Sequence, residues 1–477
     1  MCGNEGATEV LPKRAESESE GARAEIRKAL LRKAAKRKAL QRKGGPCNVR
    51  RVRALWGGSS GIAVTKDVHG NTARSAPAPA GRGPGPLVPA VAGKRCSLCE
   101  STDLFVFAER ARVPVHQNIP ADSARAARDV TRGDLQLACC RSCGFITNLE
   151  FDDRLVTYEP GYENDQTHSP VFEAHTTALI ASLVDAGCKD TFVLEIGAGQ
   201  GQFLRQLCIE GSNRGQGFDP AYIGPQAIDA GRVTFVREPY RGQAPAETPH
   251  LVLCRHVLEH VPDPMALLRD IRDGVCRQRA VRIAFELRTV DWVLEKMMVQ
   301  DFFYEHCSYF TQDSLRFAFE RAGFTNVVTR ATFAGQYLWA TAEYNPAAPR
   351  RSQPRRDASA LVRAVERYQK YAESNGAALQ AKLEQLRAAG PVAIWGAGAK
   401  GVTYLNMVDP EADMVDCTAD VNPKKQGKFV VGTGHPIVSP EQMVARGVRG
   451  VLVMNPVYLD EVRQIMRALG PNVVVVA

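Results

Sequence analysis

The stretch VLEIGAGQGQFL, residues 193–204, constrains the fold of this 477-residue chain more than any other. Its apolar start predicts a strand, glycines follow at alternate positions, and its end predicts a helix. Strands alternate with helices onward to about residue 286, through RGQGFDP, HLVLCRHVLEHV and VRIAFEL. This alternation is typical of a parallel sheet covered by helices, so we expect an α/β fold.

The positive charge of the chain is concentrated at its start. The first 95 residues hold 20 Lys and Arg against 7 Asp and Glu, so the overall charge of +9 leaves the remainder slightly acidic. Residues 1–93 also contain SAPAPAGRGPGPLVPAVAG, whose composition cannot bury a core. We expect a solvated tail there, with a nucleic-acid-binding or membrane-surface patch as the alternative, and no run of apolar residues long enough to span a membrane.

Thirteen cysteines, an odd number spread through apolar segments, do not suggest a disulfide framework. They predict a reduced, cytoplasmic chain in which clustered cysteines bind metal. Two Cys-x2-Cys pairs stand about forty residues apart, Cys96 with Cys99 and Cys140 with Cys143. Four thiolates satisfy a tetrahedral Zn²⁺ ion and leave no open position, so the zinc is expected to be structural; buried or redox-active thiols are the alternative.

Changes in composition divide the chain into four parts. After the tail, residues 94–155 are expected to form the zinc-binding module and residues 156–345 the first α/β domain. A segment rich in Pro and Arg then precedes residues 360–477, which begin with an amphipathic helix over 360–388 and continue as a second α/β unit of Rossmann-like type.

The first glycine-rich turn favours a cationic or amine-bearing ligand. Glu195 stands two residues before the first glycine, and the Gly-x-Gly-x-Gly spacing differs from the Gly-x-Gly-x-x-Gly of a dinucleotide site. The pattern resembles motif I of class I S-adenosylmethionine (SAM) methyltransferases. This resemblance implies that Asp219, at the end of the next strand, binds the ribose, and that the amino acid moiety is bound by Glu195, Gly197, Gly199 and Gly201. His256 is a further candidate for cofactor binding, with packing as the alternative.

The stretch FFYEHCSYF, residues 302–310, places Glu305 and His306 among aromatic residues. Over residues 94–477 the chain resembles the SAM-dependent sugar C-methyltransferases. The resemblance includes both cysteine pairs, EIGAGQG, VLEHVPDP, EHCSYF, GAGAKG and DVNPKKQGKFVVGTGHPIVSPE. It implies a zinc domain, a methyltransferase domain and a C-terminal α/β domain. It also implies methylation at carbon 3 of a 4-keto-deoxy sugar linked to a nucleotide diphosphate.

The resemblance assigns roles within this segment. His306 is expected to be the general base that removes a proton next to a ketone, and Glu305 its orienter or a substrate ligand. Tyr304 or Tyr309 is expected to donate a hydrogen bond to the enolate oxygen. The chain departs from the family at two positions, with Phe303 where a tyrosine is common and Tyr304 where a histidine is common. Asn118 is a further candidate for the acceptor site.

A second glycine-rich turn has the dinucleotide spacing, with Gly396, Gly398 and Gly401. On its own it would fit a NAD-dependent oxidoreductase. In the family it belongs to the acceptor domain, where the start of the helix and Lys400 could hold a diphosphate, or where the turn is only structural. An O- or N-methyltransferase of another small metabolite is the remaining alternative.

Overall fold

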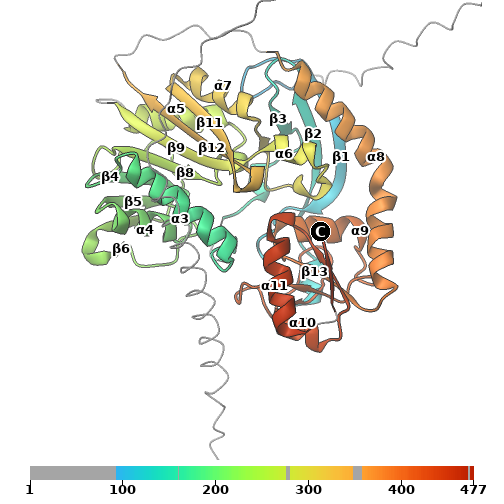
Figure 1. The fold of residues 1–477 in the computed structure, drawn as a ribbon. Helices are drawn as coiled ribbons and strands as arrows, with labels where there is room; N and C mark the ends of the chain where they lie inside the picture. Colours follow the sequence, from blue (N-terminus) through green and yellow to red (C-terminus); the bar gives the residue numbers. More distant parts are fainter. Residues whose placement is uncertain (1–92, 159–160, 276–279, 347–356, 471–472) are drawn as a thin grey trace, which may run out of the picture. The chain divides into compact units, whose positions relative to one another are not determined.

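The computed structural model describes residues 93–158, 161–275, 280–346, 357–470 and 473–477. The tail expected over residues 1–93 lies outside these ranges, except for Gly93. The described residues form three sheets with helices packed against them (Figure 1). The expected α/β class is confirmed. Within the described residues, no helix combines the length and the apolar character needed to cross a bilayer.

The N-terminal sheet is antiparallel and has the order β1-β2-β3-β10. Its first three strands are β1 (Leu104–Pro114), β2 (Arg132–Cys140) and β3 (Ile146–Asn148), and helix α2 (Ala124–Arg128) lies between β1 and β2 in sequence. The fourth strand, β10 (Ser308–Tyr309), comes from the segment that contains the predicted base. This pairing could not be predicted from the sequence, because two residues are too few to show a periodic pattern.

The central sheet has eight strands in the order β11-β12-β9-β8-β4-β5-β7-β6. Strands β4, β5, β7, β8 and β9 are mutually parallel, while β12 runs antiparallel to both of its neighbours. This is the parallel arrangement expected for a class I methyltransferase domain, extended by a short hairpin strand. The strands are β4 (Phe192–Ile196), β5 (Arg214–Phe218), β6 (Ala227–Ile228), β7 (Val233–Val236), β8 (Leu251–Arg255), β9 (Val281–Arg288), β11 (Thr325–Thr332) and β12 (Tyr337–Tyr344).

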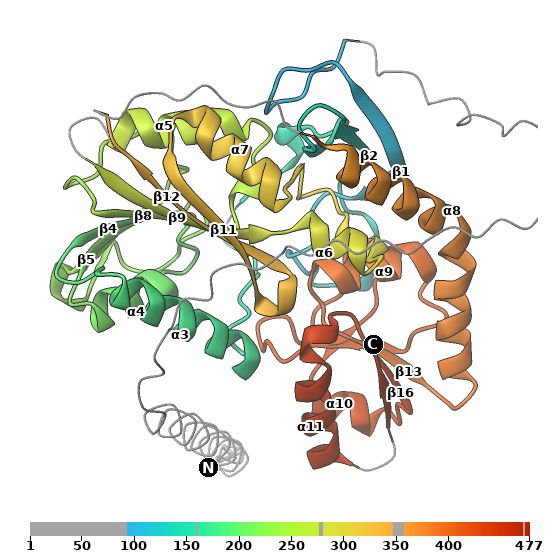
Figure 2. The same ribbon diagram turned by 45° about the horizontal axis from the view of Figure 1, so that its top comes forward.

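Helices cover both faces of this sheet (Figure 2). Helices α3 (Pro170–Asp185) and α4 (Gln202–Glu210) pack on one face, and α5 (Pro264–Val275) and α7 (Gln312–Ala322) pack on the other. The ends of α7 follow from its sequence. Thr311 and Ser314 form a reciprocal cap at its start, and Gly323 ends it with φ of 97°, a conformation that favours glycine. The short helix α6 (Val290–Glu295) follows β9.

The C-terminal sheet is entirely parallel and has the order β15-β14-β13-β16-β17. Its strands are β13 (Val392–Trp395), β14 (Cys417–Ala419), β15 (Ile437–Val438), β16 (Gly450–Val453) and β17 (Val474–Val476). The helices are α9 (Ala399–Val408), α10 (Pro440–Ala445) and α11 (Leu459–Leu469). The second glycine-rich turn lies between β13 and α9, as the Rossmann-like pattern predicts.

One long helix, α8 (Ser359–Arg387), contributes to two cores. Val365 and Tyr368 are buried in the apolar cluster that contains residues of β1, β2 and α6. Leu383, five turns later, is buried in the cluster of the C-terminal sheet. In Figure 1 this helix, in orange, runs from beside β1 to beside α9. The helix expected over residues 360–388 is therefore present, and it joins the N-terminal sheet to the C-terminal one.

Asp409 and His435 form a buried contact within the C-terminal domain. The carboxylate of Asp409, at the end of α9, lies 2.8 Å from His435 Nε2 and accepts a hydrogen bond from the main-chain N–H of Val415 at 2.8 Å. Both side chains are at most 1% exposed. Burial would raise the pKa of Asp409, but the bonds from His435 and Val415 outweigh it and hold that pKa below its usual range.

We predict that Asp409→Asn lowers the free energy of unfolding by on the order of 3 kcal/mol, because it leaves a buried imidazole without its charged partner. A carboxyl group with a lowered pKa stabilises the fold above its unfolded pKa of about 4, and the contribution is lost as pH falls below that value. Urea titrations at neutral and acidic pH measure both effects. Asp413→Asn, at an exposed neighbour, is the matched control; equal stability of the two variants would contradict the prediction.

Candidate active site

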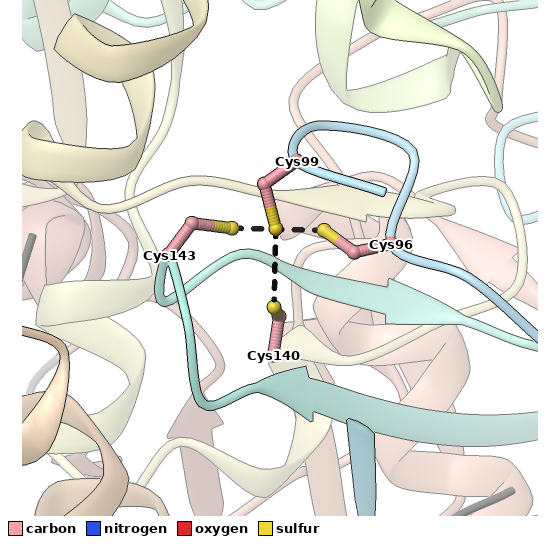
Figure 3. Close-up of side chains that lie close together, drawn as sticks. All are labelled: Cys96, Cys99, Cys140 and Cys143. Carbon is pink, nitrogen blue, oxygen red and sulfur yellow. Dashed lines mark hydrogen bonds between the residues drawn. The ribbon is translucent and has the colours of Figure 1, made fainter. Parts of the chain in front are cut away.

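The four paired cysteines meet at one point (Figure 3). All four sulfur atoms lie within 4.8 Å of one another, with Cys96 3.6 Å from Cys143 and Cys99 3.5 Å from Cys140. The neighbouring thiols, Cys143 first, lower the pKa of Cys140, which favours a thiolate. Four soft ligands without a carboxylate fit structural Zn²⁺. The fifth nearby thiol, Cys139, is buried and lies outside the cluster.

The first glycine-rich turn requires its glycines. Gly197, Gly199 and Gly201 have φ of 71°, 54° and 80°, in the left-handed region that side chains disfavour. A Cβ on Gly197 would come within 2.0 Å of Val257, and one on Gly201 within 2.3 Å of Phe235. The turn therefore packs directly against the residue that follows His256, and this contact places the turn beside the loop at the end of β8.

Two carboxylates flank the turn, as predicted. Glu195 is 1% exposed, and its Oε2 has no hydrogen-bond partner among the described residues. Burial raises its pKa to about 8. Asp219 accepts hydrogen bonds from the main-chain N–H of Gly199 at 2.7 Å and of Ala221 at 2.8 Å, and burial raises its pKa as well. An unpaired buried carboxylate is costly, so Glu195 is suited to bind a cationic group.

His256, which follows β8, lies between two buried carboxylates. Its Nδ1 is 3.4 Å from Glu259 and its Nε2 3.5 Å from Glu286. Burial lowers the pKa of His256, but the two carboxylates outweigh it and raise that pKa. Glu286 is itself bound by Arg255 at 2.8 Å and by His175 at 2.5 Å. His256 is thus placed at the strand ends that carry the other cofactor candidates, and its role there stays a prediction.

The segment with Glu305 and His306 is held against the loop that follows β8. Cys307 donates its main-chain N–H to the carbonyl oxygen of Glu259 at 3.1 Å, and the Ser308 hydroxyl donates to the carbonyl oxygen of Val261 at 2.8 Å. Because that loop also contacts Gly197, the predicted base and the predicted cofactor turn belong to one continuous region of the structure.

The imidazole of His306 is 5% exposed and packs on two rings. Its ring centroid lies 4.1 Å from that of Phe303 and 4.6 Å from that of His260. Nδ1 is buried and has no hydrogen-bond partner in the described part of the chain. Burial, followed by the nearby His260 and Arg288, holds the pKa of His306 well below its usual range. At neutral pH the imidazole is therefore uncharged and able to accept a proton.

Glu305 does not contact the imidazole through its carboxylate. Its Oε1 accepts a hydrogen bond from the main-chain N–H of Gln117 at 2.8 Å, and its Oε2 accepts from Asn118 at 3.2 Å and Tyr162 at 3.1 Å. Burial raises its pKa to about 7 despite these donors. The expectation that Glu305 orients the His306 imidazole is therefore wrong for this structure, because its carboxylate is bound to the Gln117–Asn118 loop and Tyr162. The structure does bring the candidate Asn118 to this carboxylate.

Tyr304 and Tyr309 are placed differently from the donor role expected for them. The Tyr304 hydroxyl accepts a hydrogen bond from the main-chain N–H of Asp152 at 2.8 Å. The Tyr309 hydroxyl donates to the carbonyl oxygen of Phe303 at 3.1 Å. Buried main-chain groups need partners, and these hydroxyls supply them, so neither is a free donor beside His306.

The sequence reasoning missed two other tyrosines. The Tyr158 hydroxyl lies 2.8 Å from Nδ1 of His260, whose pKa burial lowers to about 4, and Tyr162 binds Glu305. Both belong to the short stretch YEPGYEND, where two tyrosines in a polar loop were the available signal. Arg288, at the end of β9, was also missed; its Nη1 pairs with Asp301 at 2.9 Å.

Lys400, in the second glycine-rich turn, is occupied by an ion pair. Its ammonium group binds Asp301, from the segment just before the predicted base, and it is 5% exposed. Burial lowers the pKa of Lys400 to about 7. The diphosphate-binding role that was one expectation for this lysine would require that pair to open. Lys425 donates a hydrogen bond to the carbonyl oxygen of Ala397 at 3.3 Å, and Ala397 belongs to the second glycine-rich turn.

Two family models match the chain. A methyltransferase domain matches residues 172–329, and a C-methyltransferase C-terminal domain matches residues 351–474. The first range contains the glycine turn, both flanking carboxylates and His306, and the second contains the second glycine-rich turn. No curated protein matches the chain.

Matches among solved structures include several methyltransferases of low sequence identity. The Burkholderia thailandensis 1,6-didemethyltoxoflavin N1-methyltransferase, solved with S-adenosylhomocysteine, is 20% identical, covers 37% of this chain and 79% of its own, and has a TM-score of 0.28. The Synechocystis magnesium protoporphyrin IX methyltransferase is 17% identical, covers 37% and 84%, and has a TM-score of 0.29. A Mesorhizobium loti SAM-dependent methyltransferase is 15% identical, covers 36% and 99%, and has a TM-score of 0.29.

We predict that the purified protein contains one zinc ion per chain and that Cys140→Ser loses it. Loss of a structural zinc removes the link between the two cysteine turns, so the melting temperature should fall by several degrees or the N-terminal sheet should unfold. Metal analysis and thermal melts measure this. Cys139→Ser is the control, since that thiol is buried next to the cluster but outside it; zinc retained by Cys140→Ser would contradict the assignment.

Proposed function

Since the chain belongs to the SAM-dependent C-methyltransferases, with a methyltransferase domain followed by a C-methyltransferase C-terminal domain, we propose that it methylates a carbon next to a ketone. We propose further that the acceptor is a nucleotide-linked 4-keto-deoxy sugar, methylated at carbon 3. The observation that carries the reaction type is the neutral, buried imidazole of His306, which lies in the same region as the glycine turn and has an unbound nitrogen.

The first step in this proposal is proton removal. A carbon next to a ketone carries a weakly acidic proton, and the His306 imidazole accepts it while the C–H electron pair moves toward the carbonyl oxygen. The imidazolium is disfavoured in a buried site, and the negative charge that forms on the acceptor offsets this because the two charges lie close together in a region of low dielectric constant.

The second step is methyl transfer to the resulting carbanion. SAM, when bound, would supply an electrophilic methyl group on a sulfonium: the methyl–sulfur bond would break as the new C–C bond forms, and S-adenosylhomocysteine would leave. The protein contributes position. Glu195, with its unbound oxygen, would bind the ammonium group of the cofactor, Asp219 the ribose, and the glycine turn would allow close approach of the main chain.

Glu305 acts in this proposal by holding the acceptor loop. Its carboxylate binds Gln117, Asn118 and Tyr162, which belong to two segments of the N-terminal half of the chain. The carboxylate therefore ties both of these segments to the residue next to the proposed base. None of the ten cysteines in the described ranges forms a disulfide, which fits the cytoplasmic location that we propose for the reaction.

We predict that His306→Asn abolishes methyl transfer and leaves SAM affinity within about twofold of the wild type, since the imidazole acts on the acceptor. Mass spectrometry of products formed from a panel of nucleoside diphosphate-linked 4-keto-6-deoxyhexoses, together with calorimetry for SAM, measures both. His250→Asn, at the start of β8 on the opposite edge of the sheet, is the control. Deuterium uptake at the acceptor carbon separates C-methylation from O- or N-methylation, and normal turnover by His306→Asn would rule out this base.

We predict that Glu195→Gln weakens SAM binding by about 10- to 100-fold, which corresponds to loss of a charge-assisted hydrogen bond of about 1.5–3 kcal/mol. Calorimetry with SAM measures the change. Glu210→Gln, at the exposed end of α4, should bind SAM as the wild type does. Unchanged affinity in Glu195→Gln would mean that this carboxylate does not contact the cofactor.

A further inference from the structure

The proposed reaction requires a hydrogen-bond donor for the enolate oxygen, and the nearby phenol groups are all engaged. The hydroxyls of Tyr304 and Tyr309 bind main-chain groups. Tyr162 donates to Glu305, and Tyr158 bonds to His260. Phe303, which packs directly on His306, has no hydroxyl at all. The donor must therefore come from another kind of side chain.

Arg288 has unused hydrogen-bond donors next to Phe303. Its guanidinium carbon lies 6.0 Å from the Phe303 ring centroid and 5.9 Å from that of Tyr337, and His306 packs on the same Phe303 ring at 4.1 Å between centroids, so the guanidinium and the imidazole are both neighbours of Phe303. Nη1 is paired with Asp301. Among the described residues, Nη1 is the guanidinium nitrogen that makes a hydrogen bond; Nε and Nη2 make none, and because the side chain is 21% exposed they are available to a ligand.

Arg288 shares its carboxylate partner with a second basic group. Asp301 pairs with both Arg288 and Lys400, so one carboxylate serves two basic side chains. The neighbouring carboxylate of Glu286 is bound by Arg255. An arginine that shares its carboxylate keeps N–H groups available for a further anion, and the enolate is the anion that the proposed reaction forms there.

We propose that Arg288 binds the carbonyl oxygen of the acceptor and stabilises the enolate that forms when His306 removes the adjacent proton. The proton passes to the imidazole, the C–H electron pair moves into the carbonyl group, and the negative charge on oxygen is held by N–H groups of the guanidinium. Asp301 fixes the guanidinium in place through Nη1. This inference rests on the proposed function, because it assigns the donor for that reaction.

The test measures proton exchange separately from methyl transfer. Each variant is incubated in D₂O with the panel of nucleoside diphosphate-linked 4-keto-6-deoxyhexoses and S-adenosylhomocysteine, and deuterium at the acceptor carbon is followed by mass spectrometry. Arg288→Ala should slow exchange by about 10²- to 10³-fold, as removal of one oxyanion donor does. Its SAM affinity should be unchanged, and added guanidinium ion should restore part of the exchange. Arg330→Ala, an exposed arginine of β11, should exchange at the wild-type rate.

A second variant separates chemistry from structure. Asp301→Asn keeps the guanidinium but removes its anchor, so it should slow exchange less than Arg288→Ala does and gain nothing from added guanidinium. Wild-type exchange in Arg288→Ala would overturn the inference while the proposed function stood. The inference would also be overturned if both variants showed equal losses in exchange rate and equal falls in melting temperature, and if added guanidinium ion restored exchange in neither. No exchange by the wild-type protein on the whole panel would overturn the proposed function and this inference together.

Discussion

The pairing of β10 with β3 is the constraint on which the site depends. Ser308 pairs with Thr147 and Tyr309 with Ile146, so two residues that lie shortly after the predicted base belong to the sheet of the cysteine module. On its other side, the same segment is bound to the loop after β8 through Cys307 and Glu259. The segment that carries Glu305 and His306 is therefore held from both sides by main-chain hydrogen bonds. The positions of the two side chains depend on both the cysteine module and the methyltransferase domain.

This arrangement explains how ionisable groups can be buried so densely. Along the strand ends, carboxylates and bases alternate, with Glu286 between Arg255 and His175, and His256 between Glu286 and Glu259. Pairs of this kind satisfy most of the local charge. Glu195 and His306, the residues proposed to bind the cofactor and to accept the proton, are among the side chains that keep a buried atom without a hydrogen-bond partner in the described residues. A rigid set of paired side chains with a few unsatisfied hydrogen-bonding atoms is what a binding site is expected to contain.

What could be predicted from the sequence was local. The Cys-x2-Cys pairs, the glycine turn and the alternation of strands with helices are encoded within a few residues, and the structure contains all three features. The partners of Glu305 were not predictable in this way, because Gln117 lies 188 residues away and Tyr162 lies 143 residues away. The same holds for Tyr304 and Tyr309, whose aromatic context gave no indication that their hydroxyls bind main-chain groups. Strand β6 of the central sheet could not be predicted either, because its two residues are too few to show a pattern.

The path of α8 has a consequence for how such a protein can be assembled in evolution. Its first half completes the core beside β1, and its last turns complete the core beside β13. A gene fragment that ended before residue 359 would leave Phe107 and Phe302 without Tyr368, the ring that both contact. The cysteine module and the C-terminal domain thus cannot be exchanged independently of each other. Recombination between relatives would preserve the fold only if both halves of α8 came from the same parent.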